Sequence, residues 1–148
     1  MVDPDRYKPL RLIAADADDL GVLSACLQDA VAKVGDFAWL PAERRFAFVA
    51  NRFVWELDGG AKGPFWRTRA GAHFNDVKSV QHINIRNNAK DAVVELLAIR
   101  YERREDSLDA IYLDFSGGGV IRLDVEAVNA EMRDLSGPWR AHSKPAHD

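Results

Sequence analysis

Residues 108–126 show the clearest alternation of apolar and polar positions in this sequence, on both sides of a glycine triplet at 117–119. A period of two is typical of strands with one buried face. The apolar positions are Ile111, Leu113, Phe115, Ile121, Leu123 and Val125. All are odd-numbered, so facing residues sum to an even number, which favours a three-residue loop with a left-handed glycine. We expect a hairpin centred on Gly118, with Phe115 opposite Ile121.

The N-terminal pattern predicts one strand followed by one helix. The apolar run at 10–15 suits a strand, and apolar residues then recur at helical spacing, at Leu20, Leu23 and Leu27. Asp16 is a good N-cap and is followed by acidic residues, which favour the positive end of the helix dipole. We therefore expect a helix from Ala17 to Gln28.

The next segment has the pattern of a meander of strands. Ala30–Val34 and Phe37–Leu40 flank Gly35-Asp36, which predicts a two-residue hairpin. The apolar positions of Arg44–Leu57 change from even to odd numbers along the strand. Such a change of parity predicts a bulge or bend near Asn51-Arg52.

The second half of the chain continues with strands and ends ambiguously. The composition of 58–64 predicts a loop, and 65–86 reads as one long or two shorter strands broken near Asn75-Asp76. Residues 93–102 are apolar on both faces and predict a central strand. Residues 127–135 fit both a helical and a strand period. We favour the helix, because the segment has few β-branched residues.

Three segments carry a resemblance to known proteins: RLIAADADDLGVLSACLQDAVAKVGD, FVANRFVWE and FSGGGVIRLDVEAV. Together they resemble a family of small bacterial proteins described as a domain of unknown function. The resemblance covers about Arg11 to Leu135 and implies a single-domain bacterial protein. It brings no functional residues that could be transferred to this chain.

We expect a flexible N-terminal arm at 1–9, a single globular α+β domain at 10–135 and a disordered tail at 136–148. The fold should be mainly antiparallel, with one N-terminal helix followed by seven to nine strands. These strands would form a strongly bent sheet or a small, partly open barrel. A pleckstrin-homology-like barrel is one form that this could take, and such an analogy would not specify function.

Composition narrows the class of protein further. The chain has 148 residues, ordinary apolar and charged fractions, and no apolar run near the ~18 residues that a membrane span needs. The N-terminus lacks the apolar core of a secretory signal. The single cysteine, Cys26, forms no internal disulfide and no multi-cysteine metal site. These features indicate a cytoplasmic protein that does not enter the membrane.

Charge is unevenly distributed along the chain, although the net charge is only −3. Residues 44–104 contain twelve Lys or Arg and six Asp or Glu, whereas the flanks contain eight basic and seventeen acidic residues. Strands from the middle and the flanks interleave in a β-rich fold. We therefore expect the basic residues to be neutralised more than gathered on one surface.

The sequence offers no catalytic residue, metal ligand set or cofactor motif. GxSxG, HExxH and CxxC patterns are all missing. Cys26 falls late in the predicted helix beside the leucine stripe, so a buried structural thiol is the expectation. His73 and His82 could lie near each other if Asn75-Asp76 is a turn, but two histidines are too few for a zinc site.

A basic and aromatic middle supplies the candidate ligand-binding residues: Arg52, Trp55, Arg67, Arg69, His73, His82 and Arg86. Arginines beside exposed aromatics suit phosphate contacts and base stacking. In the alternative, Trp55 and Trp66 fill the core and the arginines cover a solvated sheet face. The overall acidity of the chain argues against a nucleic-acid partner.

Our leading hypothesis is a non-enzymatic cytoplasmic binding or adaptor module, for a protein partner or for self-association. An anion or nucleic-acid binder that uses the basic and aromatic sheet face is the second hypothesis. A small-metabolite enzyme, with His73 or His82 as acid–base, is the third.

Overall fold

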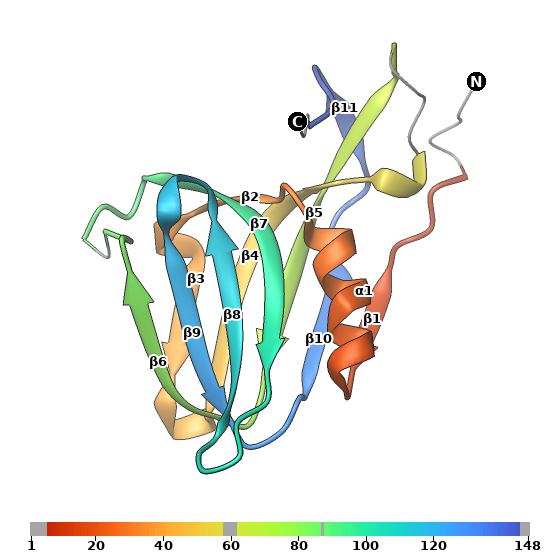
Figure 1. The fold of residues 1–148 in the computed structure, drawn as a ribbon. Helices are drawn as coiled ribbons and strands as arrows, with labels where there is room; N and C mark the ends of the chain where they lie inside the picture. The colour runs from red at the N-terminus through yellow and green to blue at the C-terminus, as the bar shows by residue number, and fades with distance from the viewer. Residues whose placement is uncertain (1–5, 58–61, 87, 146–148) are drawn as a thin grey trace.

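The computed structural model describes residues 6–57, 62–86 and 88–145, which form one helix and an antiparallel sheet (Figure 1). The helix is α1 (Ala17–Leu27). The strands are β1 (Arg11–Ala14), β2 (Val31–Lys33), β3 (Phe37–Leu40), β4 (Arg45–Phe53), β5 (Phe65–Phe74), β6 (Val77–Ile83), β7 (Val93–Glu102), β8 (Asp109–Phe115), β9 (Val120–Val125), β10 (Ala130–Asp134) and β11 (Trp139–Ala141). The predicted α+β class is confirmed. The predicted strand number is too low, because β10 and β11 lie in segments that the sequence analysis assigned to a helix and to a disordered tail.

The strand order shows how the sheet curls and where it stays open. It runs β1-β10-β5-β4-β2-β7-β8-β9-β6, while β11 pairs with β5 and β3 pairs with β4. All of these pairings are antiparallel. Val31 of β2 pairs with Asn51 of β4 and with Glu95 of β7, so this short strand joins the two halves of the sheet. Within the described chain β3 and β6 each pair along one edge only, so the sheet does not close.

The helix forms as predicted and covers part of the sheet. The Asp16 side chain accepts a hydrogen bond from the Asp19 amide at 2.8 Å, which caps the first turn. Its buried stripe consists of Leu20, Leu23 and Leu27. The helix packs against β7, β1 and β4 (Figure 1). Ser24 Oγ accepts a hydrogen bond from the Ile99 amide at 2.8 Å, which ties α1 to β7.

The hairpin of β8 and β9 has the predicted loop length but a different register. Gly117 and Gly118 both have positive φ, at 79° and 86°, as a three-residue loop with left-handed glycines requires. However, Leu113 faces Ile121, so the loop centres on Gly117. The predicted centre at Gly118 is wrong because Gly119 is extended and its carbonyl accepts from the Phe115 amide at 2.8 Å.

The predicted hairpin of Ala30–Val34 with Phe37–Leu40 is wrong. Strands β2 and β3 both run antiparallel to β4, so the chain continues in one direction through the short 3-10 turn at 34–36. The Gly35 amide instead donates to the Lys90 carbonyl at 2.8 Å. The glycine serves close approach to the 84–92 turn and does not reverse the chain.

The parity change in β4 has a different origin from the predicted bulge. Register with β5 is unbroken from the pair Phe46–Phe74 to the pair Phe53–Arg67. The strand simply ends there, and a 3-10 turn at 55–57 redirects the chain to bury Leu57. No bulge lies near residue 51 or 52, because Arg52 continues the inward-facing set.

Two C-terminal segments differ from the prediction. Residues 130–134 form strand β10, not a helix, because they fill the gap between β1 and β5. Ala130 and Met132 are buried there, which is the strand alternative of the 127–135 pattern. Part of the predicted tail forms β11, which pairs with β5. Residues 1–5 and 146–148 of the predicted arm and tail lie outside the described residues.

The break predicted near Asn75-Asp76 is confirmed, and it directs the chain from one half of the sheet to the other. Asp76 takes a left-handed φ of 58° between β5 and β6. Strand β6 then pairs with β9 and not with β5. Among the described residues, no helix combines the length and apolar character needed to cross a bilayer.

Candidate functional site

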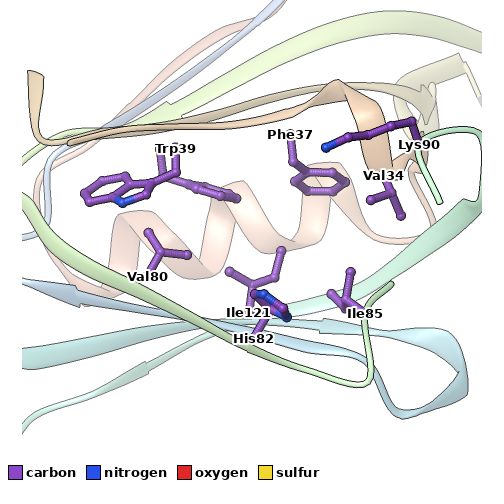
Figure 2. Close-up of a pocket in the computed structure, with 9 residues that line it drawn as sticks. Val34, Phe37, Trp39, Val80, His82, Ile85, Lys90 and Ile121 are labelled. Carbon is purple, nitrogen blue, oxygen red and sulfur yellow. The ribbon is translucent and has the colours of Figure 1, made fainter. Parts of the chain in front are cut away.

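An apolar groove of about 350 Å³ opens between β3 and β6, where the sheet fails to close (Figure 2). We call it the seam groove. It is lined by Val34, Phe37, Trp39, Phe46, Val80, His82, Ile85, Lys90 and Ile121.

One wall of the seam groove is aromatic and is supported from the core. Strand β3 directs Phe37 and Trp39 toward the groove, and their cross-strand partners on β4 are Phe48 and Phe46. The Phe37 ring stacks on Phe48 at 5.2 Å between centroids and meets the edge of Phe115 at 5.6 Å. Such pairs add about 0.5–1.5 kcal/mol beyond area burial. The wall is therefore preformed.

The facing wall comes from the other half of the sheet. Val80 and His82 lie two residues apart on β6, so they share a face, and His82 pairs with Ile121 on β9. Figure 2 shows Val80, Ile121 and His82 across the groove from Trp39 and Phe37. The two walls thus come from strands that are distant in sequence.

The turn at 84–92 closes one end of the groove with Ile85 and Lys90. Two glycines permit this close packing. A Cβ at Gly119 would lie 3.1 Å from Ile85 Cγ1, and a Cβ at Gly35 would lie 3.0 Å from the Lys90 carbonyl oxygen. Substituting either glycine would push the turn away from the groove.

The lining of the groove is mostly apolar. Its polar side chains are the exposed His82 and Lys90 and the indole of Trp39. No carboxylate of the described residues lines it, so these residues supply no acid–base pair of carboxylates there. The described part of the chain contains no group of three or more His, Cys, Asp or Glu residues placed to hold a metal ion.

Arg52, a candidate surface residue, belongs instead to a buried ionic cluster that we call the Arg52 cluster: Tyr7, Arg52, Glu56 and Asp134. The Arg52 guanidinium is fully buried and donates to both Asp134 oxygens, at 2.8 and 2.9 Å. It also donates to both Glu56 oxygens at 2.8 and 2.9 Å, and the Tyr7 hydroxyl donates to Asp134 at 2.6 Å. This arginine is saturated and cannot bind an external anion.

The pKa values within the Arg52 cluster follow from this pairing. Burial alone would raise the pKa of Asp134, but hydrogen bonds from Arg52 and Tyr7 outweigh it and lower that pKa. Burial and the hydrogen bond to Asp134 raise the pKa of Tyr7 to about 12. The cluster therefore holds the charges of Arg52 and Asp134 in the core, with Glu56 at its exposed edge, and is structural.

The other basic and aromatic candidates do not form one site. Trp55 is half-buried against Phe53, with ring centroids 4.6 Å apart. Arg67 is half-buried, and its guanidinium donates to the Asn51 carbonyl at 3.1 Å, while burial lowers its pKa. Arg69 is exposed and donates to the Asn51 side chain at 3.3 Å. Arg86 lies exposed in the turn after β6.

The two candidate histidines lie on different surfaces. His73 is on β5, paired with Ala47 and Glu131, whereas His82 lines the seam groove. Burial and nearby Arg45 lower the pKa of His73. The structure thus does not bring the two histidines together.

Part of the basic middle is neutralised by the acidic flanks, as predicted. Arg44 and Lys78 both pair with Glu126, at 2.9 and 3.1 Å. Arg100 pairs with Asp114, and Arg104 lies 3.5 Å from Asp124.

Cys26 is half-buried, and burial raises the pKa of its thiol. It is thus less buried than the sequence predicts, and the raised pKa disfavours the thiolate, which is the nucleophilic form.

Sequence reasoning found only His82 among the groove residues. Phe37, Trp39 and Val80 show the period of two that marks any half-buried strand. What makes them a site is that β3 and β6 have no strand neighbour on one side among the described residues, which depends on the strand order. The sequence holds no local signal for that property.

Fold and groove together define an α+β protein with an incompletely closed antiparallel sheet and an apolar groove at the opening. The chain belongs to the family described as "Protein of unknown function (DUF2948)", whose model matches residues 10–147. This match confirms the resemblance to a domain of unknown function, and the description names no activity. Comparisons with curated proteins and with solved structures gave no match.

Proposed function

We propose that this protein is a non-enzymatic binding module that holds an extended, apolar segment of a partner protein in the seam groove. The observation that carries the proposal is the position of the groove. It lies between two strands, β3 and β6, whose facing edges have no strand partner among the described residues.

The unpaired strand edges supply the affinity for an extended segment. Strand β3 pairs only with β4, and β6 only with β9, in the described chain. An unpaired edge presents rows of N–H and C=O groups, which can pair with an added strand. A segment lying along either edge would satisfy its own backbone as well as that of the protein.

The groove supplies the selectivity. Its volume of about 350 Å³ is within the range of ligand pockets, about 300–1,000 Å³. Alternate side chains of an added strand point to the same side, so two apolar side chains spaced by two residues would enter together. Phe37, Trp39 and Val80 would contact them. Exposed Lys90 and His82 favour an acidic residue beside them.

The proposed setting is the cytoplasm of a bacterial cell. The single Cys26, whose thiol has a raised pKa, suits a reducing compartment. The resemblance to small bacterial proteins supports the source, and an adaptor that recognises other proteins fits a small domain with a preformed groove.

The experiment uses synthetic hexapeptides that alternate Phe or Leu with Glu, titrated into isotope-labelled protein while amide NMR shifts are recorded. We expect shifts confined to β3, β6 and the 84–92 turn. Val80→Glu should weaken binding by more than about tenfold, equivalent to ~1.4 kcal/mol. The matched control is Val93→Glu, since Val93 is a strand valine that is 64% exposed and lies outside the groove lining.

A second set of peptides separates strand addition from side-chain binding. Backbone N-methylation at alternate residues removes the donors needed for pairing and leaves the side chains unchanged. Binding should be lost with these peptides. Equal weakening by Val80→Glu and Val93→Glu, or shifts on other strands, would reject the seam groove as the site.

A further inference from the structure

A second surface, on the outer side of the sheet, has a different chemistry. The even-numbered residues of β5, such as Ala70 and Ala72, face the core, so the odd-numbered ones face outward. A trough of about 520 Å³ runs over this outer side of β10, β5 and β4. We call this surface the outer trough. It shares no lining residue with the seam groove.

The floor of the outer trough is low because its central side chains are small. Ala47 of β4 lies beside His73 in the ladder, and Gly71 of β5 lies beside Val49 and Arg133. A Cβ at Gly71 would stand 3.3 Å from Leu135 Cδ1, so the glycine makes room for that leucine at the rim. Long side chains surround a shallow, smooth floor.

The rim of the outer trough is basic, although the whole chain is acidic. Arg11, Arg45, Arg133 and His73 line it with a single carboxylate, Glu131. Glu131 is held by Arg11 at 2.8 Å. Arg45 donates to the neutral Asn75 side chain at 2.9 Å. Exposed Arg133 has no ion pair or side-chain hydrogen bond with the described residues.

The rim of the outer trough also carries apolar side chains, so a ligand could be recognised by apolar contacts as well as by charge. Leu40 is 40% exposed and Leu135 is 53% exposed, and both line the trough. A sheet face with small central residues is a surface that a helix can cover, as helices do in α+β domains. The aromatic residue of the lining, Phe48, is 4% exposed and its ring stacks on Phe37 in the core. Stacking of nucleic-acid bases therefore has no platform here.

We infer that the outer trough binds an acidic amphipathic helix of a partner protein. The apolar stripe of the helix lies on Ala47 and against Leu40 and Leu135, the second of which covers Gly71. Its acidic side chains meet Arg45 and Arg133, neither of which forms a salt bridge with a carboxylate of the described residues. This surface is independent of the seam groove, so either site can fail its test without the other.

The probe for the test is a fluorescein-labelled synthetic helix of about 18 residues, with leucine and alanine on one face and glutamate on the other. Fluorescence polarisation should show binding at about 20 mM NaCl that weakens steeply by about 200 mM, because exposed charges are screened. A peptide with lysine in place of each glutamate should not bind. Absence of binding at about 20 mM NaCl would overturn the inference.

Three variants assign the binding to this surface. Arg133→Glu should weaken binding by at least about tenfold, and Arg103→Glu, the same change at an exposed arginine in the turn after β7, by less than about twofold. Ala47→Leu fills the floor without changing charge and should also weaken binding about tenfold. Near-UV circular dichroism verifies that each variant is folded.

The contrary outcomes are equally defined. Equal weakening by Arg133→Glu and Arg103→Glu, or full affinity of the Ala47→Leu variant, would show that attraction is not localised in the outer trough. Tighter binding of a single-stranded oligothymidine than of the acidic helix, weakened by the same variants, would assign the surface to nucleic acid and overturn the inference.

Discussion

The Arg52 cluster and the seam groove differ in what they bury: the cluster buries charged groups, and the groove leaves apolar side chains accessible. In the cluster, a guanidinium with no exposed surface is surrounded by two carboxylates that accept from it in pairs. In the groove, aromatic and aliphatic side chains remain accessible from solvent. In these two regions charge is buried and apolar side chains are accessible, which is the reverse of the usual distribution of residues.

This contrast distinguishes a structural feature from a binding feature. A buried ion pair gives little net stability over an apolar replacement, but breaking it by removing one partner is costly. An open apolar groove leaves apolar area in water, so the stabilisation from burying that area is gained only when an occupant covers it. The cluster should therefore be sensitive to mutation in stability, and the groove in binding.

The largest effect is expected for Asp134→Ala. It leaves Arg52 buried with only Glu56 as its ionic partner, so the free energy of unfolding should fall by about 3–5 kcal/mol. Urea denaturation measures this change. Arg100→Ala, which breaks the exposed pair with Asp114, is the control and should cost at most ~1 kcal/mol. Similar costs for both variants would remove the distinction between cluster and surface.

The next largest effect is a change of stability at acidic pH. The pKa of Asp134 is lowered in the folded protein, so its contribution to stability is complete above the unfolded value of ~3.9 and is lost as pH falls through the folded value. The stability difference between wild type and Asp134→Asn should therefore shrink below about pH 4. A difference that stays constant from neutral to strongly acidic pH would contradict the assigned pKa direction.

A smaller effect is expected at the edge of the cluster. Tyr7→Phe removes the hydrogen bond to Asp134 and should cost about 1 kcal/mol at neutral pH. The pKa of Tyr7 rises from 10.0 to about 12, so this contribution is present below pH 10 and is lost as pH rises through 12. Unfolding measured across that alkaline range should show wild type approaching the variant. Parallel curves would exclude the role of the hydroxyl.

The smallest effect on stability is expected in the seam groove. Val80 is half-buried at the opening, so Val80→Asn should change the free energy of unfolding by less than about 1 kcal/mol. The same variant should reduce peptide binding by the groove. A large loss of stability would show that the groove wall is part of the closed core.

The sequence predicts elements that depend on neighbours in the chain. Helix α1 is specified by its Asp16 cap and its leucine stripe, and the β8–β9 hairpin by alternation around glycines. Even there, the register needed the φ values of Gly117 and Gly118. Local patterns give the type of element reliably and its exact partner poorly.

What the sequence misses depends on distant parts of the chain. Strand β10 has weak strand propensity and forms because β1 and β5 leave a gap that it fills. Arg52 was assigned to a surface by its chemistry, although its even number continues the inward set of β4. The buried partner of that charge is Asp134, which is far away in sequence, and Glu56 pairs with it from the exposed side.

The long-range pairing of β1 with β10 also limits how far the chain can fold during its synthesis on the ribosome. Strand β1 is made before the other described strands, yet in the described structure its sheet partner is β10, which follows nine of them in the sequence. Asp134, which forms the buried ion pair with Arg52, is also the last residue of β10. A growing chain that stops before residue 130 thus lacks both the strand that docks its beginning and the carboxylate that its interior requires.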